Sequence, residues 1–254
     1  AVGSSCNVAS SMFILNGIVA EQLVRFKTLV DKEMAEGLSQ DKAMMKIIRQ
    51  FLVESRDIRF EGNGYSEEWH REASRRGLKA INSVPDAYKE LISPESVKMF
   101  EEQGILSERE AHARYEVLNE TYIKKLQIEA RVMGDLTTNH VIPTAISFQN
   151  SLVENVKGIK ELFPDDYAEL CKTQLNMIRK ISGYVNQLHL YVHDLVEARK
   201  VANVIEDIPR KSEAYYSTVF PYMDKIRTVV DKLEMVIDDE LWPLPKYREM
   251  LFFR

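Results

Sequence analysis

The chain has 254 residues, of which 45% are hydrophobic and 29% are charged, an ordinary balance for a soluble globular protein. A net charge of −5 argues against a nucleic-acid surface, which needs a basic stripe. No apolar run approaches the ~20 residues that span a bilayer, so no membrane partner is expected. Two cysteines are too few for a disulfide framework, and a reducing cytoplasm is the expected location.

The first residues indicate an N-terminal helix. Apolar residues at helical spacing predict a helix from about Asn7 to Glu36, with Gly37 as its stop. Its expected apolar side comprises Phe13, Ile14, Ile18, Leu23 and Phe26. Ser39 then has the character of an N-cap for a second amphipathic helix, whose face comprises Met44, Ile47, Ile48, Phe51 and Leu52.

Turn residues interrupt this helical pattern. Gly62-Asn63-Gly64 predicts a tight turn, because these residues tolerate positive φ. Ser66 is expected to cap a short helix that Gly77 ends, with acidic residues in its first turn and basic residues in its last. A brief strand is expected only at Ile58 to Phe60.

Two further helices are expected before the midpoint of the chain. Ser93-Pro94 supplies a cap and a proline at the first helical position, and Gly104 ends that helix. Ser107 and Glu110 form a capping box. It begins the longest helical stretch, from Glu108 to about Phe163, with a kink or break expected near His140 to Ile142 because of Pro143.

The last third predicts two packed helices, about Asp165 to Glu206 and Ser212 to Asp239, separated by Pro209. Apolar residues recur alternately three and four positions apart in both, as in antiparallel helices that share a seam. The predicted seam comprises Ile178, Ile181, Val185, Leu188, Val192, Leu195, Val219, Met223, Ile226, Val230, Leu233 and Ile237.

The sequence therefore predicts an all-α protein: an elongated antiparallel bundle of long helices, preceded by shorter helices, with almost no strand. Four segments are expected. They are the first long helix (1–36), short helices with the Gly-Asn-Gly turn (37–106), the long-helix bundle (107–240) and an aromatic, proline-containing tail (241–254). The tail carries Trp242, Tyr247, Phe252 and Phe253, which are expected to fold back onto the bundle.

Few residues suggest chemistry. His189 and His193 are four apart on one helix face, with Asp194 beside them, a spacing that suits two zinc ligands. No HExxH motif or third ligand accompanies them, so exposed histidines are the simpler interpretation. The Gly62-Asn63-Gly64 turn could cradle a phosphate, yet it lacks GxGxxG and GxxxxGK[ST]. A structural turn is the preferred interpretation, with a contact to another subunit as the alternative.

The remaining candidates are carboxylates and thiols. A di-metal carboxylate bundle would need Glu-x-x-His motifs on two helices, and the long-helix bundle (107–240) contains none. A solvated face is therefore expected for Glu108, Glu110, Glu116, Glu120 and Glu129. Cys6 and Cys171 have no local histidine or basic activator that would make them nucleophiles. We therefore predict no catalytic, cofactor-binding or metal-binding residue in this chain.

Several blocks resemble type III glutamine synthetases, and together they cover essentially the whole chain. The blocks are Ala1-Val-Gly-Ser-Ser-Cys-Asn-Val-Ala9, Asn16 to Leu23, Arg59 to Trp69, Arg76-Gly-Leu78, Leu106 to Glu110, Ile128-Glu-Ala-Arg131 and Leu241 to Arg248. The resemblance places Ala1 at the end of a catalytic domain, and a start without Met or an entry element favours a C-terminal piece of a longer protein. Ser4, Ser5 and Asn7 would then belong to a loop that caps the first helix.

The resemblance implies a parent enzyme that joins ammonia to glutamate at the expense of ATP. It implies magnesium or manganese held by carboxylates, and subunits arranged as a dodecamer of two hexameric rings. The family's metal-binding and ATP-contacting residues fall before Ala1, so the chain alone is expected to be inactive and to serve subunit packing and assembly. The alternative is a free-standing helical scaffold that binds a partner protein along a groove of its bundle.

Overall fold

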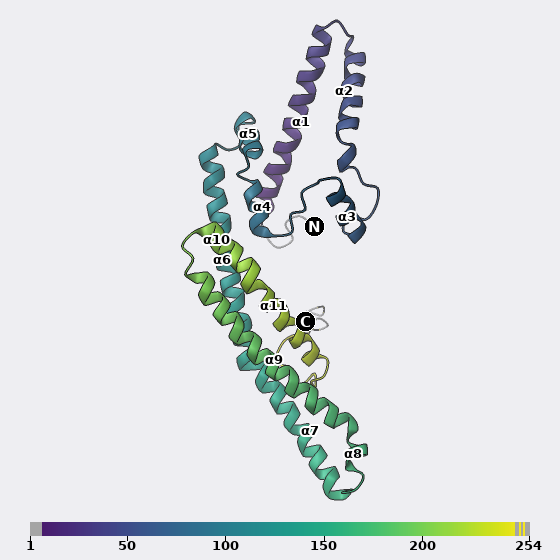
Figure 1. Ribbon diagram of the computed structural model, residues 1–254, viewed down its shortest axis with the longest axis vertical. Helices are drawn as coiled ribbons and strands as arrows, with labels where there is room; N and C mark the ends of the chain where they lie inside the picture. Colours follow the sequence, from purple (N-terminus) through teal and green to yellow (C-terminus); the bar gives the residue numbers. More distant parts are fainter. Residues whose placement is uncertain (1–6, 247–248, 250, 252–254) are drawn as a thin grey trace. The chain divides into compact units, whose positions relative to one another are not determined.

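The computed structural model describes residues 7–246, 249 and 251. It is 78% helical, and the residues it describes include no strand, which confirms the all-α class. The chain divides into two compact units, Ala1–Val117 and Leu118–Arg254, and the boundary lies within helix α6, Glu108–Leu136. The four segments predicted from the sequence were defined by helix and turn signals rather than by contacts, and they stay a prediction. Each unit is described by itself below (Figure 1).

The first unit begins with a helical hairpin. Helix α1 (Ala9–Ala35) and helix α2 (Gln40–Glu54) meet at Gly37, whose φ of 99° gives the left-handed stop that the sequence predicted. The rings of Phe26 and Phe51 lie 5.7 Å apart, and Ile47 is 1% exposed between the helices. Ser39 occupies the N-cap position of α2, but its hydroxyl makes no capping hydrogen bond.

The strand expected at Ile58 to Phe60 is wrong. Residues Arg56–Ile58 form a 3₁₀ turn, η1, and the chain then runs to helix α3, Glu67–Arg75. Ser66 caps α3 as predicted, because its hydroxyl accepts the N–H of Trp69 at 3.3 Å. The Phe60 ring stacks on the Trp69 ring at 4.5 Å, so the short apolar run serves a local aromatic contact rather than a sheet.

The turn before α3 depends on Asn63 rather than on positive φ. Among the described residues, positive φ occurs only at Gly37, Gly77 and Gly104. The Asn63 side chain accepts the N–H of Tyr65 at 3.0 Å, and its carbonyl accepts the N–H of Ser66 at 3.0 Å. Gly62 is needed for space, since a Cβ there would lie 2.8 Å from the Phe60 ring.

Three capped helices follow. Helix α4 (Val84–Glu90) was not expected, although Ser83 caps it by accepting the N–H of Asp86 at 3.1 Å. Helix α5 (Pro94–Glu102) begins at the predicted Ser93-Pro94 signal and ends before Gly104. The capping box of α6 is confirmed: Glu110 accepts the Ser107 N–H at 2.9 Å, and the Ser107 hydroxyl accepts the Glu110 N–H at 3.3 Å.

The second unit contains a helix that passes Pro143 without breaking. The chain continues from α6 through η2, a π-helical turn at Thr137–Val141, into helix α7, Ile142–Leu162. The Ile142 N–H bonds to the Thr137 carbonyl five residues earlier. Proline cannot donate this kind of bond and clashes with the carbonyl four residues back, and the wider π turn accommodates both defects. Of the kink or break expected near His140 to Ile142, the structure has no break: a π turn carries the helix past Pro143.

The remaining helices return along the bundle. They are α8 (Tyr167–Leu170), α9 (Lys172–Asn203), α10 (Ile208–Ala214), the π turn η3 (Tyr215–Val219) and α11 (Phe220–Glu234). Pro209 lies inside the first turn of α10 rather than between helices, and Asp207 caps that turn. Helix α11 ends at Glu234, five residues before the expected end at Asp239. A second π turn thus precedes a second proline, Pro221.

The predicted seam forms the core of the second unit, where α9 packs against α7 and α11 (Figure 1). Of the twelve predicted seam residues, Val185, Val192 and Val230 are partly buried against this core and Ile178 is half-buried beside it. The fully buried ones are Ile181, Leu188, Leu195, Val219, Met223, Ile226, Leu233 and Ile237. Trp242 is buried in the same core, as the fold-back prediction requires; Tyr247, Phe252 and Phe253 lie outside the described residues.

Candidate functional site

The side chains that suggested metal chemistry do not converge. His189 and His193 are exposed on α9, and Asp194 is half-buried beside them. Within the part of the chain that the structure describes, no group of three or more His, Cys, Asp or Glu residues could hold a metal ion. His189, His193 and Asp194 therefore belong to no such group within these residues.

The carboxylates along α6 have other roles. Glu110 belongs to the capping box, where bonds from the Ser107 backbone and hydroxyl lower its pKa. Glu120 forms an ion pair with Lys124 at 2.9 Å. The others, Glu108, Glu116 and Glu129, are exposed. Cys171 is a buried free thiol at the start of α9, and Cys6 lies outside the described residues.

A polar cluster at the end of α3 is fully engaged in holding the local fold. Glu72 accepts bonds from Arg75 and Arg76, which lower its pKa to about 2. Arg76 also donates to the carbonyls of Asp57 and Arg59, at 3.1 and 2.7 Å, and lies over the Trp69 ring. Because these groups satisfy one another, the cluster ties η1 to α3 rather than waiting for a ligand.

The start of α1 carries an exposed apolar surface. The Asn7 side chain accepts the N–H of Ala9 at 2.8 Å, in line with its predicted capping role; Ser4 and Ser5 lie outside the described residues. One face of the first half of α1 then presents an apolar row to solvent. We call this row the α1 stripe; its members are 46–64% exposed and comprise Val8, Met12, Leu15, Val19 and Leu23.

The α1 stripe is exposed because α2 is shorter than α1. The members of the stripe are spaced by three or four residues, so they lie on one helix face. That face continues into Phe26 and Val30, which α2 covers. Helix α2 ends at Glu54, beside Arg25, to which Glu54 is paired at 2.8 Å, and the earlier turns of α1 have no cover from it.

The opposite face of α1 is covered within the first unit. Phe13 packs near Phe100 of α5, with ring centroids 6.2 Å apart. Gly17 is buried, and a Cβ there would lie 2.6 Å from Ile105 Cδ1, so only glycine permits this close approach without movement. The residues predicted to form one apolar side of α1 therefore lie on different faces. Phe13 packs inward, whereas Ile18 and Leu23 are exposed.

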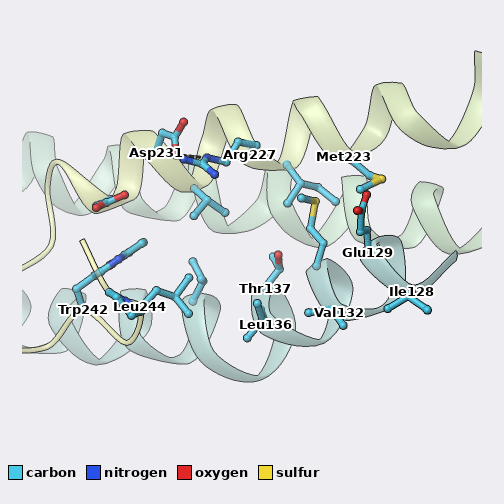
Figure 2. Close-up of a pocket in the computed structure, with 16 residues that line it drawn as sticks. Ile128, Glu129, Val132, Leu136, Thr137, Met223, Arg227, Asp231, Trp242 and Leu244 are labelled. Atoms are coloured by element: carbon cyan, nitrogen blue, oxygen red, sulfur yellow. Dashed lines mark hydrogen bonds and ion pairs between the residues drawn. The ribbon is translucent and has the colours of Figure 1, made fainter. Parts of the chain in front are cut away.

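A second surface lies in the second unit. We call it the α6–α11 groove: a cavity of about 610 Å³ lined by α6, η2, α11 and the segment after α11. Figure 2 shows α6 side chains such as Val132 and Leu136 facing α11, with Trp242 and Leu244 at one end. Ile128 and Val132 are 62% and 49% exposed, so the groove opens to solvent along α6.

Four charged side chains and one hydroxyl also line the groove. Arg227 and Asp231 of α11 form an ion pair at 2.7 Å (Figure 2). Glu129 and Glu234, which also line the groove, add negative charge. Thr137 is 2% exposed at the π turn. No nucleophile with a neighbouring base is present among these lining residues. The groove therefore suits the burial of apolar side chains of a partner rather than acid–base or nucleophilic chemistry.

These features define an all-α chain with an exposed apolar helix face and an apolar groove. A family model described as "Glutamine synthetase C-terminal domain" matches residues 43–160. The chain is 46% identical over 253 residues to a glutamine synthetase of Bacteroides fragilis, and 34% identical over 262 residues to a type-3 glutamine synthetase of Dictyostelium discoideum. The resemblance predicted from the sequence is confirmed: residues 43–160 match the C-terminal domain of glutamine synthetases, and the chain is similar to glutamine synthetases along its length.

The matches cover nearly all of this chain but only part of each relative. They cover 99% and 100% of this chain but 35% of each relative. A glutamine synthetase of Butyrivibrio fibrisolvens is 28% identical over 82% of this chain, which is 29% of that relative. The chain thus spans about a third of the length of these relatives. No helix among the described residues is long and apolar enough to cross a membrane.

Proposed function

We propose that this chain is the C-terminal part of an ATP-dependent glutamate–ammonia ligase of the type III group, and that it serves packing and assembly rather than chemistry. The observation that carries the proposal is the α1 stripe, an apolar helix face left open in a chain that spans 35% of its glutamine synthetase relatives. The missing cover fits the part of such an enzyme that precedes the stripe.

The stripe offers enough free energy for specific docking. Full burial of an aliphatic side chain contributes about 1.5–3 kcal/mol, and each member of the stripe is roughly half exposed. Covering all five side chains therefore contributes about 4–7 kcal/mol before the entropy of association is subtracted. For a segment of the same chain that entropy is small, because the tether supplies a high effective concentration.

The chemistry of the proposed parent enzyme belongs to the remainder of the protein. ATP and magnesium or manganese would bind there, and residues 1–254 alone would make no glutamine. The resemblance further favours neighbouring subunits as partners, in a dodecamer of two hexameric rings in the cytoplasm, with no nucleic acid and no membrane. The net charge of −5 supports the exclusion of nucleic acid.

The test uses the full-length enzyme that contains this sequence. Leu15→Gln with Val19→Gln is expected to lower glutamine synthesis and to shift the sedimentation coefficient toward smaller species. The matched control is Val53→Gln on α2, whose side chain is 73% exposed outside the stripe. If deletion from residue 107 onward and the stripe variant both left sedimentation and activity unchanged, the assembly role would be refuted. Glutamine formation by purified residues 1–254 would refute the division of chemistry.

The α6–α11 groove supports a second candidate, a free-standing scaffold that holds a helix of a partner protein. Its apolar lining and acidic margin fit an amphipathic helix with basic flanks. The coding sequence before Ala1 separates the two candidates. An in-frame catalytic domain supports the ligase, whereas a start codon at or just before Ala1 supports the scaffold.

A further inference from the structure

Two arginines face each other across the seam between α6 and α9. Gln127 of α6 donates to Asn203 of α9 at 2.6 Å, which fixes the register of the two antiparallel helices. One helical turn further along, Arg131 on α6 lies opposite Arg199 on α9. Both line a cavity of about 290 Å³, which we call the α6–α9 pocket.

Neither arginine has a carboxylate partner among the described residues. Asp135, which also lines the pocket, accepts a bond from Asn139 at 2.6 Å. Glu197, two residues before Arg199, pairs with Lys200 at 2.7 Å. Arg131 is exposed and Arg199 is half-buried, so solvent screens part of the repulsion between these two like charges.

The surroundings of the pocket strengthen the electrostatic effect. Its floor is apolar, because Ala130 and Leu195 are 3% and 1% exposed, and an apolar floor lowers the local dielectric. Burial raises the pKa of Tyr215, and the charges of Arg199 and Arg131 oppose that rise. Both guanidinium groups therefore act on the same buried region. Thr138 and Asn139 add a hydroxyl and a carboxamide to the lining.

We propose that the α6–α9 pocket binds a phosphate group between Arg131 and Arg199. Guanidinium groups present paired N–H donors that match the oxygens of phosphate, and two of them on facing helices would neutralise one dianion. The pocket volume of about 290 Å³ admits inorganic phosphate or the terminal phosphate of a nucleotide. This site is separate from the stripe and the groove.

The test titrates the 254-residue chain with inorganic phosphate by calorimetry and thermal unfolding, at constant ionic strength maintained with chloride. Phosphate is expected to bind saturably and to raise the unfolding temperature. Arg131→Gln and Arg199→Gln are each expected to weaken binding about tenfold or more, because each removes a charge-assisted bond. The matched control, Arg179→Gln, changes an exposed arginine elsewhere on α9 and should bind like the parent chain.

A structural role for these arginines predicts the opposite behaviour without ligand. If they only stabilised the fold, both variants would unfold at lower temperature in chloride alone. The proposal expects an unchanged or higher unfolding temperature, since either substitution relieves the repulsion. Arg199→Lys keeps the charge and loses the paired donors, so its phosphate affinity should fall several-fold with the helicity intact.

A parallel titration with ADP identifies the source of the phosphate. Tighter binding of ADP than of inorganic phosphate, sensitive to both arginines, assigns the pocket to a nucleotide, and the reverse order assigns it to free phosphate. The proposal is overturned if neither ligand binds saturably, or if binding is the same in Arg131→Gln and Arg199→Gln as in the parent chain. None of these outcomes depends on the assembly role proposed above.

Discussion

The π turn η2 makes a prediction about register. A π turn closes each hydrogen bond over five residues instead of four, so it acts as one residue inserted into an α-helix. Deleting the exposed His140 should therefore convert η2 into an α turn and leave the faces of α6 and α7 in place. Because Pro143 would then clash with the preceding turn, the deletion is made together with Pro143→Ala, and Pro143→Ala alone is the reference.

The loss of stability depends on how many buried side chains a deletion displaces. Removing His140 shifts few buried atoms, and the N–H restored at position 143 offsets part of the local rearrangement. We expect a loss of about 1–2 kcal/mol, the ordinary range for a single change. Deleting the exposed Lys125 from the regular part of α6 instead rotates one side of the helix by about 100°. It would displace Ile123, Leu126 or their partners from the core, at about 2–3 kcal/mol each, enough to unfold the unit.

The assay is urea unfolding monitored by tryptophan fluorescence. The chain has two tryptophans, Trp69 in the first unit and Trp242 in the second, so Trp69→Phe leaves a probe for the second unit alone. The urea midpoint should fall by about 0.3–2 M for the His140 deletion, given a typical slope of about 1–3 kcal/mol per M. If the His140 deletion lost as much stability as the Lys125 deletion, the idea that the π turn acts as one extra residue in a continuous helix would be refuted.

Three further predictions use matched pairs or pH. Leu188→Ala should cost about 2–5 kcal/mol in urea unfolding and Leu190→Ala less than about 1, because the first side chain is 0% and the second 55% exposed; equal costs would contradict the assigned seam. Gly104→Ala should destabilise by about 1–2 kcal/mol because of its φ of 63°, whereas Gly158→Ala in the open middle of α7 should stabilise by about 0.5–1 in the same assay. The pKa of Glu72, lowered to about 2 from 4.5, contributes stability to α3 that is present above pH 4.5 and lost as pH falls toward 2. Trp69 fluorescence in a Trp242→Phe background should follow that loss, and a flat profile identical to that of Glu72→Gln would contradict it.

Helix caps and glycine stops could be predicted from the sequence because they depend on interactions within a few residues. A capping bond joins a hydroxyl to a backbone N–H only three residues away, and Ser66 and Ser107 form it as predicted, whereas Ser39 does not. Glycine stops at Gly37, Gly77 and Gly104 all adopt positive φ. Helix α4 was missed even though Ser83 carries the same signal.

Other features depend on packing that no window of sequence contains. Pro143 predicts a disturbed turn, but whether the helix breaks or widens depends on which faces of α6 and α7 meet α9, as the buried Val141 and Ala145 show. The α1 stripe could be expected as an apolar face, but its exposure follows from where α2 ends. The groove and the arginine pair needed the register of α6 against α9 and α11.

The covered face of α1 explains why its open face can work as a docking surface. Phe13, Gly17 and Glu21 anchor the first half of the helix through Phe100, Ile105 and Gln103, whose carboxamide donates to Glu21 at 2.6 Å. A helix held along one side keeps its opposite side chains in a fixed row. A partner that covers that row loses little backbone entropy on this side of the interface, so more of the burial energy is available for binding. Weakening the anchor should therefore impair docking without altering the stripe: Phe100→Leu is expected to reduce assembly of the full enzyme while all five stripe residues remain.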